Sequence, residues 1–477
     1  MIICCRLETG CQIPAQRADS SGQGWKVRPG KFETDLQGDE PMPAKFILII
    51  LDGLGDRSFQ RLGHMTPLQA ARTPFLDRFA ASGSSGLFHA SLQGQALPSE
   101  NAHFVLLGYE PGDFPGRGAL EALGAGIDLD QSQVAVLAHF VNVQKELGRL
   151  RLIMDRVRAG SEDAGQAFNA VHRYDSENVR IELVQVKGLF GVVILTGNVS
   201  PFITDSNPIL DGRLLTRIRP WAEYSDHGPS IDAANSLNKY LSWVHRKLEA
   251  TRFNRERSEK GFPALNALVT QRAGRLKQVI SFTRKFGLKG ASVSSGAVYS
   301  GLCRYLGLDV LEAPESVDPG LEISTRIEKA ADLIDKYDFV HIHSKAPDEA
   351  AHKKDPFLKK QVIQELDLGL ARSLPGLLQR EDLIVAVTSD HSTPSKGEMI
   401  HCGEPVPLAI CGPGVRVDGV LKFDEMSAAG GGLGFVRGAE FMYMVLNYLD
   451  RGKLAGLMDT PHDQPYWPGD PVPFELE

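Results

Sequence analysis

Hydrophobic residues occur along this chain in short runs that polar positions hardly interrupt. The runs occupy residues 45–51, 190–195, 339–342, 383–387 and 407–410. Runs of this kind are typical of strands buried on both faces, as in a parallel sheet. Segments with helical periodicity lie between such runs, at residues 74–82, 323–336, 357–374 and 438–449. Alternating strands and helices predict an α/β fold in which helices flank both faces of a sheet.

The order of elements is interrupted between residues 130 and 225. Strand-like segments occur there at residues 134–143, 179–186 and 191–195. Because candidate site residues lie on both sides of this block, the simplest interpretation is an inserted smaller α/β domain over residues 130–225. The core would then comprise residues 44–129 and 226–460.

The two ends of the chain lack helical or strand periodicity. Residues 1–43 mix Cys, Gly, Gln, Ser and charged residues, which predicts a disordered N-terminal tail. Residues 461–477 contain five prolines and predict an irregular C-terminal tail.

The composition is ordinary for a globular protein, with 42% hydrophobic and 23% charged residues and a net charge of -7. It gives no electrostatic argument for nucleic-acid binding. The hydrophobic runs are also far shorter than the roughly 20 residues that span a membrane. Six cysteines without a CxxC motif or a paired framework indicate reduced thiols. We therefore expect a cytoplasmic protein without nucleic-acid or membrane partners, and the oligomeric state stays open.

Polar side chains suited to metal binding follow three of the predicted strands. Asp52 ends the first run, Asp348 lies after the run at 339–342, and Asp390 with His391 follows the run at 383–387. In open α/β sheets, ligands bind beyond the carboxyl ends of the strands. These side chains are therefore candidates for one site, although an Asp-Gly pair after a strand is by itself usually a turn.

The spacing within these segments favours metal ligation. Asp348 and His352 lie four residues apart, on one face of a helix, where both can reach one cation; the alternative is a capping Asp with a solvated His. Asp390 and His391 on an irregular loop can face two different ions, and His401 follows ten residues later; the alternative is a polar loop. Mixed carboxylate and imidazole ligation suits Mn²⁺ or Zn²⁺ better than Mg²⁺. The sequence predicts two divalent metal ions.

Ser99 is the candidate nucleophile. Two cations about 4 Å apart can hold a phosphoryl group and activate a hydroxyl. Ser99 lies at a predicted helix start, where backbone N–H groups favour a phosphate. The alternative is a plain capping serine. With the metal site, this pattern predicts phosphoryl transfer from a small phosphorylated substrate.

Nine motifs occur in one order over nearly all of residues 44–455. They lie at residues 50–57, 66–74, 98–103, 116–126, 254–261, 348–352, 389–394, 401–407 and 430–438. As a set they resemble the alkaline phosphatase superfamily and, within it, the archaeal-type 2,3-bisphosphoglycerate-independent phosphoglycerate mutases. The resemblance implies an alkaline-phosphatase-like sheet with an inserted lid domain.

The resemblance also implies roles for matching residues in the interconversion of 2- and 3-phosphoglycerate. Ser99 would become a phosphoserine intermediate, and the glycerate would re-orient before it takes the phosphate back on its other hydroxyl. One ion would be held by Asp52, Ser99, Asp390 and His391. The second would be held by Asp348, His352 and His401. The implied substrate contacts are Asp155, Arg156 and Arg158 in the lid, with Arg117 and Arg257, either of which could be structural.

The departures from the family pattern lie on the substrate side. Leu189-Phe190 stands where the family has His-Arg, and Thr196-Gly197 where it has Arg-Gly. Gln271-Arg272 replaces Arg-Gly, with an arginine one position away, and Ser300-Gly301 replaces Lys-Gly. These losses leave an alternative open, namely a divergent phosphomutase or phosphatase for another phosphate ester. A metal-binding or partner-binding protein on a retained fold is a third, non-enzymatic alternative.

Overall fold

The structure is a computed structural model that describes residues 44–452 and 474–476. The predicted tails therefore lie outside the described residues, apart from residues 474–476. Cys303, Cys402 and Cys411, the cysteines within the described ranges, carry free thiols. In this part of the chain no helix is both long and apolar enough to cross a membrane.

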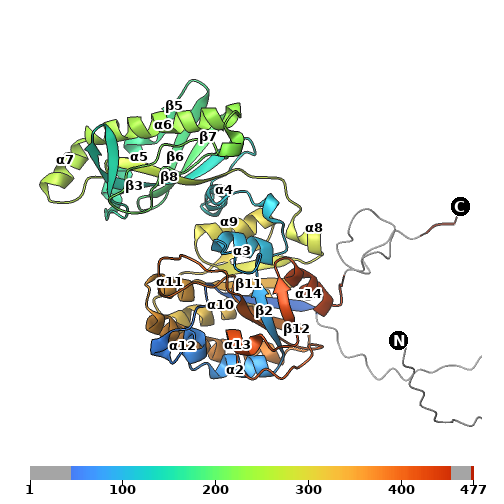
Figure 1. The fold of residues 1–477 in the computed structure, drawn as a ribbon. Helices are drawn as coiled ribbons and strands as arrows, with labels where there is room; N and C mark the ends of the chain where they lie inside the picture. The colour runs from blue at the N-terminus through green and yellow to red at the C-terminus, as the bar shows by residue number, and fades with distance from the viewer. Residues whose placement is uncertain (1–43, 453–473, 477) are drawn as a thin grey trace, which may run out of the picture. The chain divides into compact units, whose positions relative to one another are not determined.

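An eight-stranded sheet forms the first layer, in the order β10-β9-β11-β1-β12-β13-β2-β14 (Figure 1). Its strands, in chain order, are β1 (Lys45–Leu51), β2 (Ser84–His89), β9 (Gly290–Ser294), β10 (Asp309–Glu312), β11 (Phe339–Ser344), β12 (Leu383–Thr388), β13 (Val406–Cys411) and β14 (Gly434–Arg437). Strands β10, β9, β11, β1 and β12 run parallel, whereas β13 pairs antiparallel with β12 and β2. The α/β fold class predicted from the sequence is confirmed.

The unbroken hydrophobic run of β1 follows from burial on both faces. Phe46, Leu48 and Ile50 enter one hydrophobic cluster, whereas Ile47 and Ile49 enter another on the opposite face. All five are fully buried. Each such side chain contributes about 1.5–3 kcal/mol to folding, so a polar residue anywhere in β1 would be strongly destabilising.

Helices cover both faces of this sheet (Figure 1). One cluster takes side chains from α2 (Pro74–Ala81), α10 (Pro319–Leu333) and α12 (Pro356–Ser373). The other takes side chains from α3 (Ser99–Leu106), α9 (Ala297–Leu306) and α14 (Glu440–Tyr448). The remaining helices that precede residue 130 or follow residue 274 are α1 (Pro67–Ala70), α4 (Arg117–Gly124), α8 (Phe282–Phe286), α11 (Ala346–His352) and α13 (Glu425–Ala428), with the 3₁₀ turns η1 (Gln60–Leu62), η2 (Pro111–Asp113) and η4 (Leu377–Gln379).

A second, antiparallel sheet has the order β4-β3-β7-β6-β5, with β8 paired to β3. Its elements are β3 (Val134–Glu146), β4 (Arg149–Met154), α5 (Ser161–Val171), β5 (Arg173–Asp175), β6 (Val179–Lys187), β7 (Phe190–Gly197), η3 (Ala222–Tyr224), α6 (Gly228–Glu249), α7 (Arg252–Glu259) and β8 (Ala267–Gly274). The run at residues 190–195, grouped above with parallel-type strands, is β7 and pairs antiparallel with β3 and β6. It reads as a continuous run because Val193 and Val192 enter hydrophobic clusters on opposite faces.

The second sheet extends further along the chain than predicted. Leu237 and Tyr240 of α6 pack in the same cluster as β3 and β7, and β8 bonds directly to β3. The elements of this sheet and its helices reach Gly274, beyond residue 225, where the inserted domain is predicted to end, and the domain bounds stay a prediction. Helical periodicity shows that a helix has a buried face, but it cannot show which sheet that face covers.

Candidate metal centre

The acidic and imidazole candidates converge at one edge of the first sheet. Strands β11, β1 and β12 are parallel neighbours, so their carboxyl ends share an edge. Asp52 directly follows β1, Asp348 lies in α11 after β11, and Asp390 with His391 follows β12. His401 approaches from the loop before β13, where its Nδ1 lies 2.8 Å from the Leu97 carbonyl oxygen. The structure thus brings together residues that are far apart in the sequence.

A first group of possible ligands comprises Asp52, Asp390 and His391, whose ligand atoms lie within 4.8 Å of one another. The His391 Nε2 lies 3.3 Å from Asp52 Oδ1 and 3.2 Å from Asp390 Oδ2. Both of these carboxylate oxygens are buried without a hydrogen-bond partner among the described residues. Buried polar atoms are normally paired, so these two oxygens fit the ligand positions of a cation.

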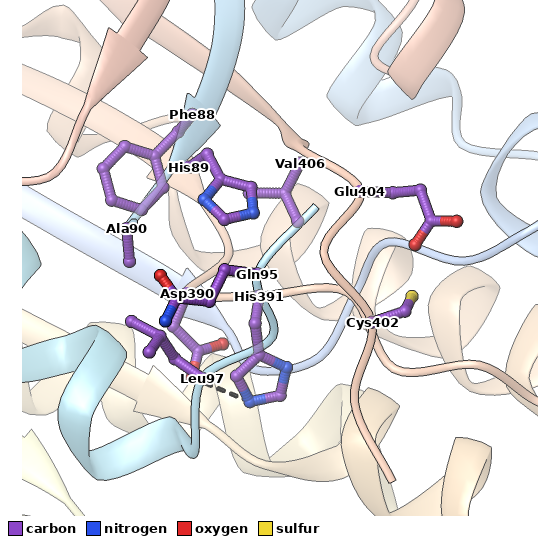
Figure 2. A pocket seen from close by; sticks show the side chains of 10 residues that line it. All are labelled: Phe88, His89, Ala90, Gln95, Leu97, Asp390, His391, Cys402, Glu404 and Val406. Atoms are coloured by element: carbon purple, nitrogen blue, oxygen red, sulfur yellow. Dashed lines mark ion pairs between the residues drawn. The ribbon is translucent and has the colours of Figure 1, made fainter. Parts of the chain in front are cut away.

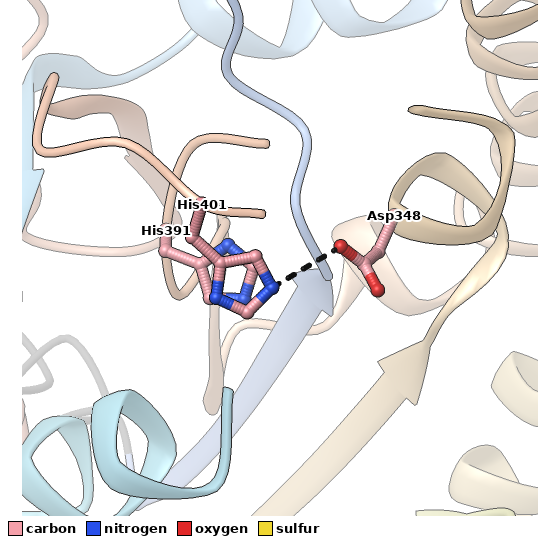
Figure 3. Close-up of side chains that lie close together, drawn as sticks. All are labelled: Asp348, His391 and His401. Atoms are coloured by element: carbon pink, nitrogen blue, oxygen red, sulfur yellow. Dashed lines mark ion pairs between the residues drawn. The ribbon is translucent and has the colours of Figure 1, made fainter. Parts of the chain in front are cut away.

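A second group comprises Asp348, His391 and His401 (Figure 3). The His401 Nε2 lies 3.7 Å from Asp348 Oδ1, and the His391 and His401 rings stack at 3.9 Å. The contact of His401 Nδ1 with Leu97 leaves Nε2 for a metal ion. His352 lies at the margin: its Nε2 is 3.2 Å from Asp348 Oδ1, and its side chain is 39% exposed. Geometry therefore places His391 in both groups, whereas the family resemblance assigned it to one.

Burial controls the protonation of these groups. Burial raises the pKa of Asp52 well above its usual range, and the negative charges of Asp390 and Asp348 raise it further. Burial lowers the pKa of His391 to about 4, which leaves its imidazole neutral at pH 7 as metal ligation requires. Burial opposes ionisation of Asp348 as well, but hydrogen bonding from His352 and the proximity of His391 lower its pKa to about 2. A cation would relieve the repulsion between these acids.

Ser99 is the first residue of α3, with Pro98 at the capping position. Its side chain is buried, and its Oγ lies 2.8 Å from His391 Nε2. The helix start adds backbone N–H groups that favour an anion. Ser99 therefore contacts the first group directly, as a nucleophile at a metal site would.

Asp390 and His391 also line a small cavity of about 10 Å³ (Figure 2). Gln95 and Leu97, from the segment before α3, lie on its wall, and His89 is held by its Nε2 against the Gly403 carbonyl oxygen. Such a volume accommodates about one water molecule. The first group is therefore backed by packed protein.

Some contacts of the centre were missed in the sequence. Tyr299 and His343 both bond to Asp52 Oδ2, and Thr393 donates a hydrogen bond to Asp348. A histidine in the middle of a buried strand is a signal that could have identified His343. No local pattern marks Tyr299. His103, one turn after Ser99, lies with its Nδ1 3.2 Å from Asp390 Oδ2.

Comparison with known proteins places this geometry in a family. Residues 44–448 match the model of the metalloenzyme superfamily. The 2,3-bisphosphoglycerate-independent phosphoglycerate mutase 2 of Methanocaldococcus jannaschii is 36% identical over 431 residues, which cover 89% of this chain and 97% of that protein. The chain belongs to the 2,3-bisphosphoglycerate-independent phosphoglycerate mutase family. The mutase of Methanopyrus kandleri is 34% identical, with 85% of this chain and 97% of that protein covered.

Solved structures agree with this membership. A Pyrococcus horikoshii protein matches 87% of this chain and 100% of its own, with a TM-score of 0.71 at 30% identity. A cofactor-independent phosphoglycerate mutase from Thermoplasma acidophilum matches with a TM-score of 0.58 at 31% identity, over 85% of this chain and 100% of its own. The predicted family is confirmed. Membership of a metalloenzyme superfamily, with the two groups above, supports dependence on divalent metal ions.

Three predicted substrate residues lie together in the loop that follows β4 of the second sheet. Asp155, Arg156 and Arg158 line one pocket of about 740 Å³. Asp155 Oδ1 lies 2.9 Å from His139 Nε2, and Arg156 Nε lies 3.1 Å from Asp155 Oδ2. The Arg156 guanidinium also lies 4.9 Å above the ring of Phe190, one of the residues that depart from the family pattern. The Phe190 ring thus holds the Arg156 guanidinium by a cation–π contact and adds no charge of its own.

The other two arginines have different surroundings. Arg117 lies beside Glu100, with Nη1 3.7 Å from its Oε2, and donates to Glu121 over 2.6 Å. Arg257 is 4% exposed and donates to Asp163 and to the carbonyl oxygens of Pro263 and Arg158. Because acceptors within the protein already occupy the donors of the Arg257 guanidinium, a structural role is favoured over substrate binding for this residue.

Arg272 is the shifted arginine of the family pattern. Its φ is +55°, in the left-handed region, at a register irregularity between β3 and β8. This bulge turns the side chain so that Nη1 lies 2.8 Å from Glu100 Oε1. Glu100 is buried next to Ser99 in the sequence, and Arg117 contacts its other oxygen. A non-glycine residue in this conformation is strained, and such strain clusters at functional sites.

Proposed function

We propose that this chain interconverts 2- and 3-phosphoglycerate through a phosphoserine at Ser99. The observation that carries the proposal is the buried contact of Ser99 Oγ with His391, beside two buried carboxylate oxygens that accept no hydrogen bond from any described residue. Its named relatives, similar over most of the chain, are phosphoglycerate mutases. The chain is thus an isomerase of the phosphoglycerate mutase type.

In the proposed reaction, the Ser99 hydroxyl gives up its proton and Oγ bonds to phosphorus while the bond between phosphorus and the glycerate oxygen breaks. The released glycerate oxygen takes a proton, and the glycerate re-orients. In the second half the other glycerate hydroxyl loses its proton and attacks phosphoserine, the bond between phosphorus and Ser99 Oγ breaks, and Oγ takes a proton, which restores Ser99. The products differ from the substrates only in the position of the phosphoryl group.

The metal centre would be filled by two divalent cations. Asp52, Ser99, Asp390 and His391 would hold one, and Asp348, His352 and His401 the other, with His391 close enough to serve either. When bound, such cations neutralise phosphoryl oxygens and favour the ionised serine. Because both groups contain imidazole, we propose Mn²⁺ or Zn²⁺ rather than Mg²⁺.

The glycerate would be retained by basic side chains around Ser99. A pocket of about 590 Å³ is lined by Pro98, Glu100, Arg117 and Arg272 among others. Arginine binds carboxylate and phosphate oxygens with two parallel donors, and Glu100 holds these two guanidinium groups beside the nucleophile. We propose that the second sheet contributes Arg156 and Arg158 as a lid that excludes water, with Asp155 orienting Arg156.

The proposal is tested by incubating the purified protein with 3-phosphoglycerate and Mn²⁺. We expect 2-phosphoglycerate by phosphorus NMR, and a phosphoryl group on Ser99 by mass spectrometry of rapidly quenched samples. Ser99→Ala should reduce turnover by at least roughly 10³-fold and abolish the modification. Ser91→Ala, in the loop before α3, is the matched control and should behave as wild type.

Two outcomes would contradict the proposal. One is absence of interconversion under conditions where the Thermoplasma acidophilum mutase is active. The other is wild-type turnover by Ser99→Ala. A panel that includes an aryl phosphate separates the alternative of another phosphate ester, which the named relatives do not favour.

A further inference from the structure

Side-chain hydrogen bonds from the described residues reach one of the two oxygens of the Asp52 carboxylate. Oδ2 accepts hydrogen bonds from the Tyr299 hydroxyl over 2.7 Å and from His343 Nε2 over 3.1 Å. Oδ1 has no hydrogen-bond partner in the described ranges and faces His391 Nε2 at 3.3 Å. Two donors on one oxygen fix the rotation of the carboxylate, so the other oxygen is directed to the first ligand group.

The position of Tyr299 is set by close packing of α9 on α4. A Cβ added to Gly301 would lie 1.8 Å from the Leu120 carbonyl oxygen, and one added to Gly124 would lie 1.8 Å from the Ala297 carbonyl oxygen. Only glycines permit this approach, and the two backbones are therefore in contact. This close approach sets the separation of α9 from α4, and Tyr299 in α9 lies within hydrogen-bond distance of Asp52.

The ring of Tyr299 is also fixed. It lies 3.9 Å from the His343 ring and 4.9 Å from the His103 ring, and only 3% of Tyr299 is exposed. The next residue, Ser300, is buried with its Oγ unpaired within the part of the chain that the structure describes. On this turn of α9, the Tyr299 hydroxyl therefore makes the hydrogen bond to the metal centre, and the Ser300 hydroxyl does not.

We propose that Tyr299 is a positioning residue of the metal centre, whose hydroxyl holds Asp52 so that Oδ1 is the ligand atom. The proposal rests on the metal centre proposed above. Groups that orient a metal ligand typically change metal affinity by about 10–100-fold when they are removed. His343 alone on Oδ2 would leave the carboxylate free to rotate about its remaining hydrogen bond.

The test is a calorimetric titration of the full, metal-free chain with Mn²⁺. We expect two Mn²⁺ ions to bind wild type, and Tyr299→Phe to weaken one of them by about 10–100-fold while the other is unchanged. The matched control is Tyr305→Phe on the same helix. The Tyr305 hydroxyl donates to the Asp113 and Lys277 carbonyl oxygens instead, so this variant should bind both ions as wild type does.

A double-mutant cycle connects the effect to Asp52. In the Asp52→Asn background, Tyr299→Phe should cause no further loss of Mn²⁺ affinity, because the ligand that it positions is gone. Unfolding curves of all variants without metal identify any variant that fails to fold. If Tyr299→Phe does not fold, Tyr299→His, which retains a ring donor, replaces it. Tyr299→His should then bind Mn²⁺ more tightly than Tyr299→Leu.

The outcomes separate this inference from the proposed function. Equal Mn²⁺ affinities for Tyr299→Phe and wild type would overturn the positioning role and leave the metal centre intact. A full additional loss in the Asp52→Asn background would overturn it as well, because Tyr299 would then act elsewhere. Failure of wild type to bind Mn²⁺ would instead refute the metal centre and, with it, this inference.

Discussion

Two charged regions of the molecule differ in burial and in their partners. One contains the acids that follow β1 and β12, and the other contains the arginines beside the second sheet. Asp52 and Asp390 are buried, and each has a carboxylate oxygen without a hydrogen-bond partner among the described residues. Arg257 is saturated by internal acceptors, and Arg156 is 64% exposed with Asp155 and Phe190 as its partners. In the first region buried carboxylate oxygens are left without a hydrogen bond from the described residues, whereas Arg156 and Arg257 each have an acidic partner within the protein.

This difference indicates how each region tolerates change. Buried acids at short distances repel one another with little screening, so their number and placement are tightly constrained. Charges at the surface are screened by water and salt, and their exchange has small energetic consequences. Substitutions that depart from the family pattern can therefore persist around the second sheet, whereas the candidate metal ligands are all retained.

The largest expected effect comes from emptying or breaking the first region. Dialysis against a chelator should reduce phosphoglycerate turnover by on the order of 10³-fold, and added Mn²⁺ should restore it. Asp390→Asn should give a similar loss that Mn²⁺ does not restore. Asp338→Asn, on a half-buried carboxylate that lies 4.0 Å from Lys45 Nζ and outside the metal centre, is the control. Full turnover by the chelated protein would remove the distinction between the two regions.

An intermediate effect is expected at Arg272, where the second sheet reaches the nucleophile. Loss of its guanidinium should raise the KM for phosphoglycerate by about 10–100-fold, since a charged hydrogen bond contributes about 1.5–3 kcal/mol. Because φ is +55° at this residue, Arg272→Gly should be about 1 kcal/mol more stable than Arg272→Ala, with equal activity. Urea unfolding and steady-state kinetics measure both quantities.

Arg173→Ala removes an exposed arginine of the same sheet, paired with Asp175, and serves as the control. An unchanged KM for both Arg272 variants would show that the second sheet contributes no anion contact through the bulge.

The smallest expected effect is on the pH dependence of the free energy of unfolding, and it comes from Glu425, a carboxyl group near the metal centre. Burial raises the pKa of Glu425, which accepts hydrogen bonds from Asp56 N–H and the Thr66 hydroxyl, from 4.5 to about 7. Between these pH values the unfolded chain releases a proton that the folded chain keeps. The free energy of unfolding contributed by this group is thus fully present below pH 4.5 and is lost as the pH rises through 7.

Glu425→Gln should therefore remove a decline of ~1–3 kcal/mol between pH 5 and 8. Denaturant unfolding at both pH values measures it. Glu398→Gln, on an exposed side chain, provides the comparison, and identical pH slopes for Glu425→Gln and wild type would contradict the expectation.

The sequence by itself determined the features that depend on local order. The unbroken hydrophobic run at residues 45–51 predicted a strand buried on both faces of a sheet. The acid that follows the run then lies at the carboxyl end of that strand, where α/β sheets bind ligands. The candidate ligands Asp348, Asp390 and His391 followed from the same argument. The predicted helix start made Ser99 a candidate nucleophile, and the family motifs added its phosphoserine role and the division of ligands between two ions, both of which remain predictions.

Tertiary structure alone decided which distant groups complete these features. Tyr299 reaches Asp52 only because glycines let α9 approach α4, and Arg272 reaches Glu100 only because a bulge places it in the left-handed region. Whether α6 covers the first or second sheet also depended on long-range packing. Hydrophobic periodicity records that a side chain is buried, but the partner it meets is fixed by contacts between segments whose spacing along the chain carries no signal.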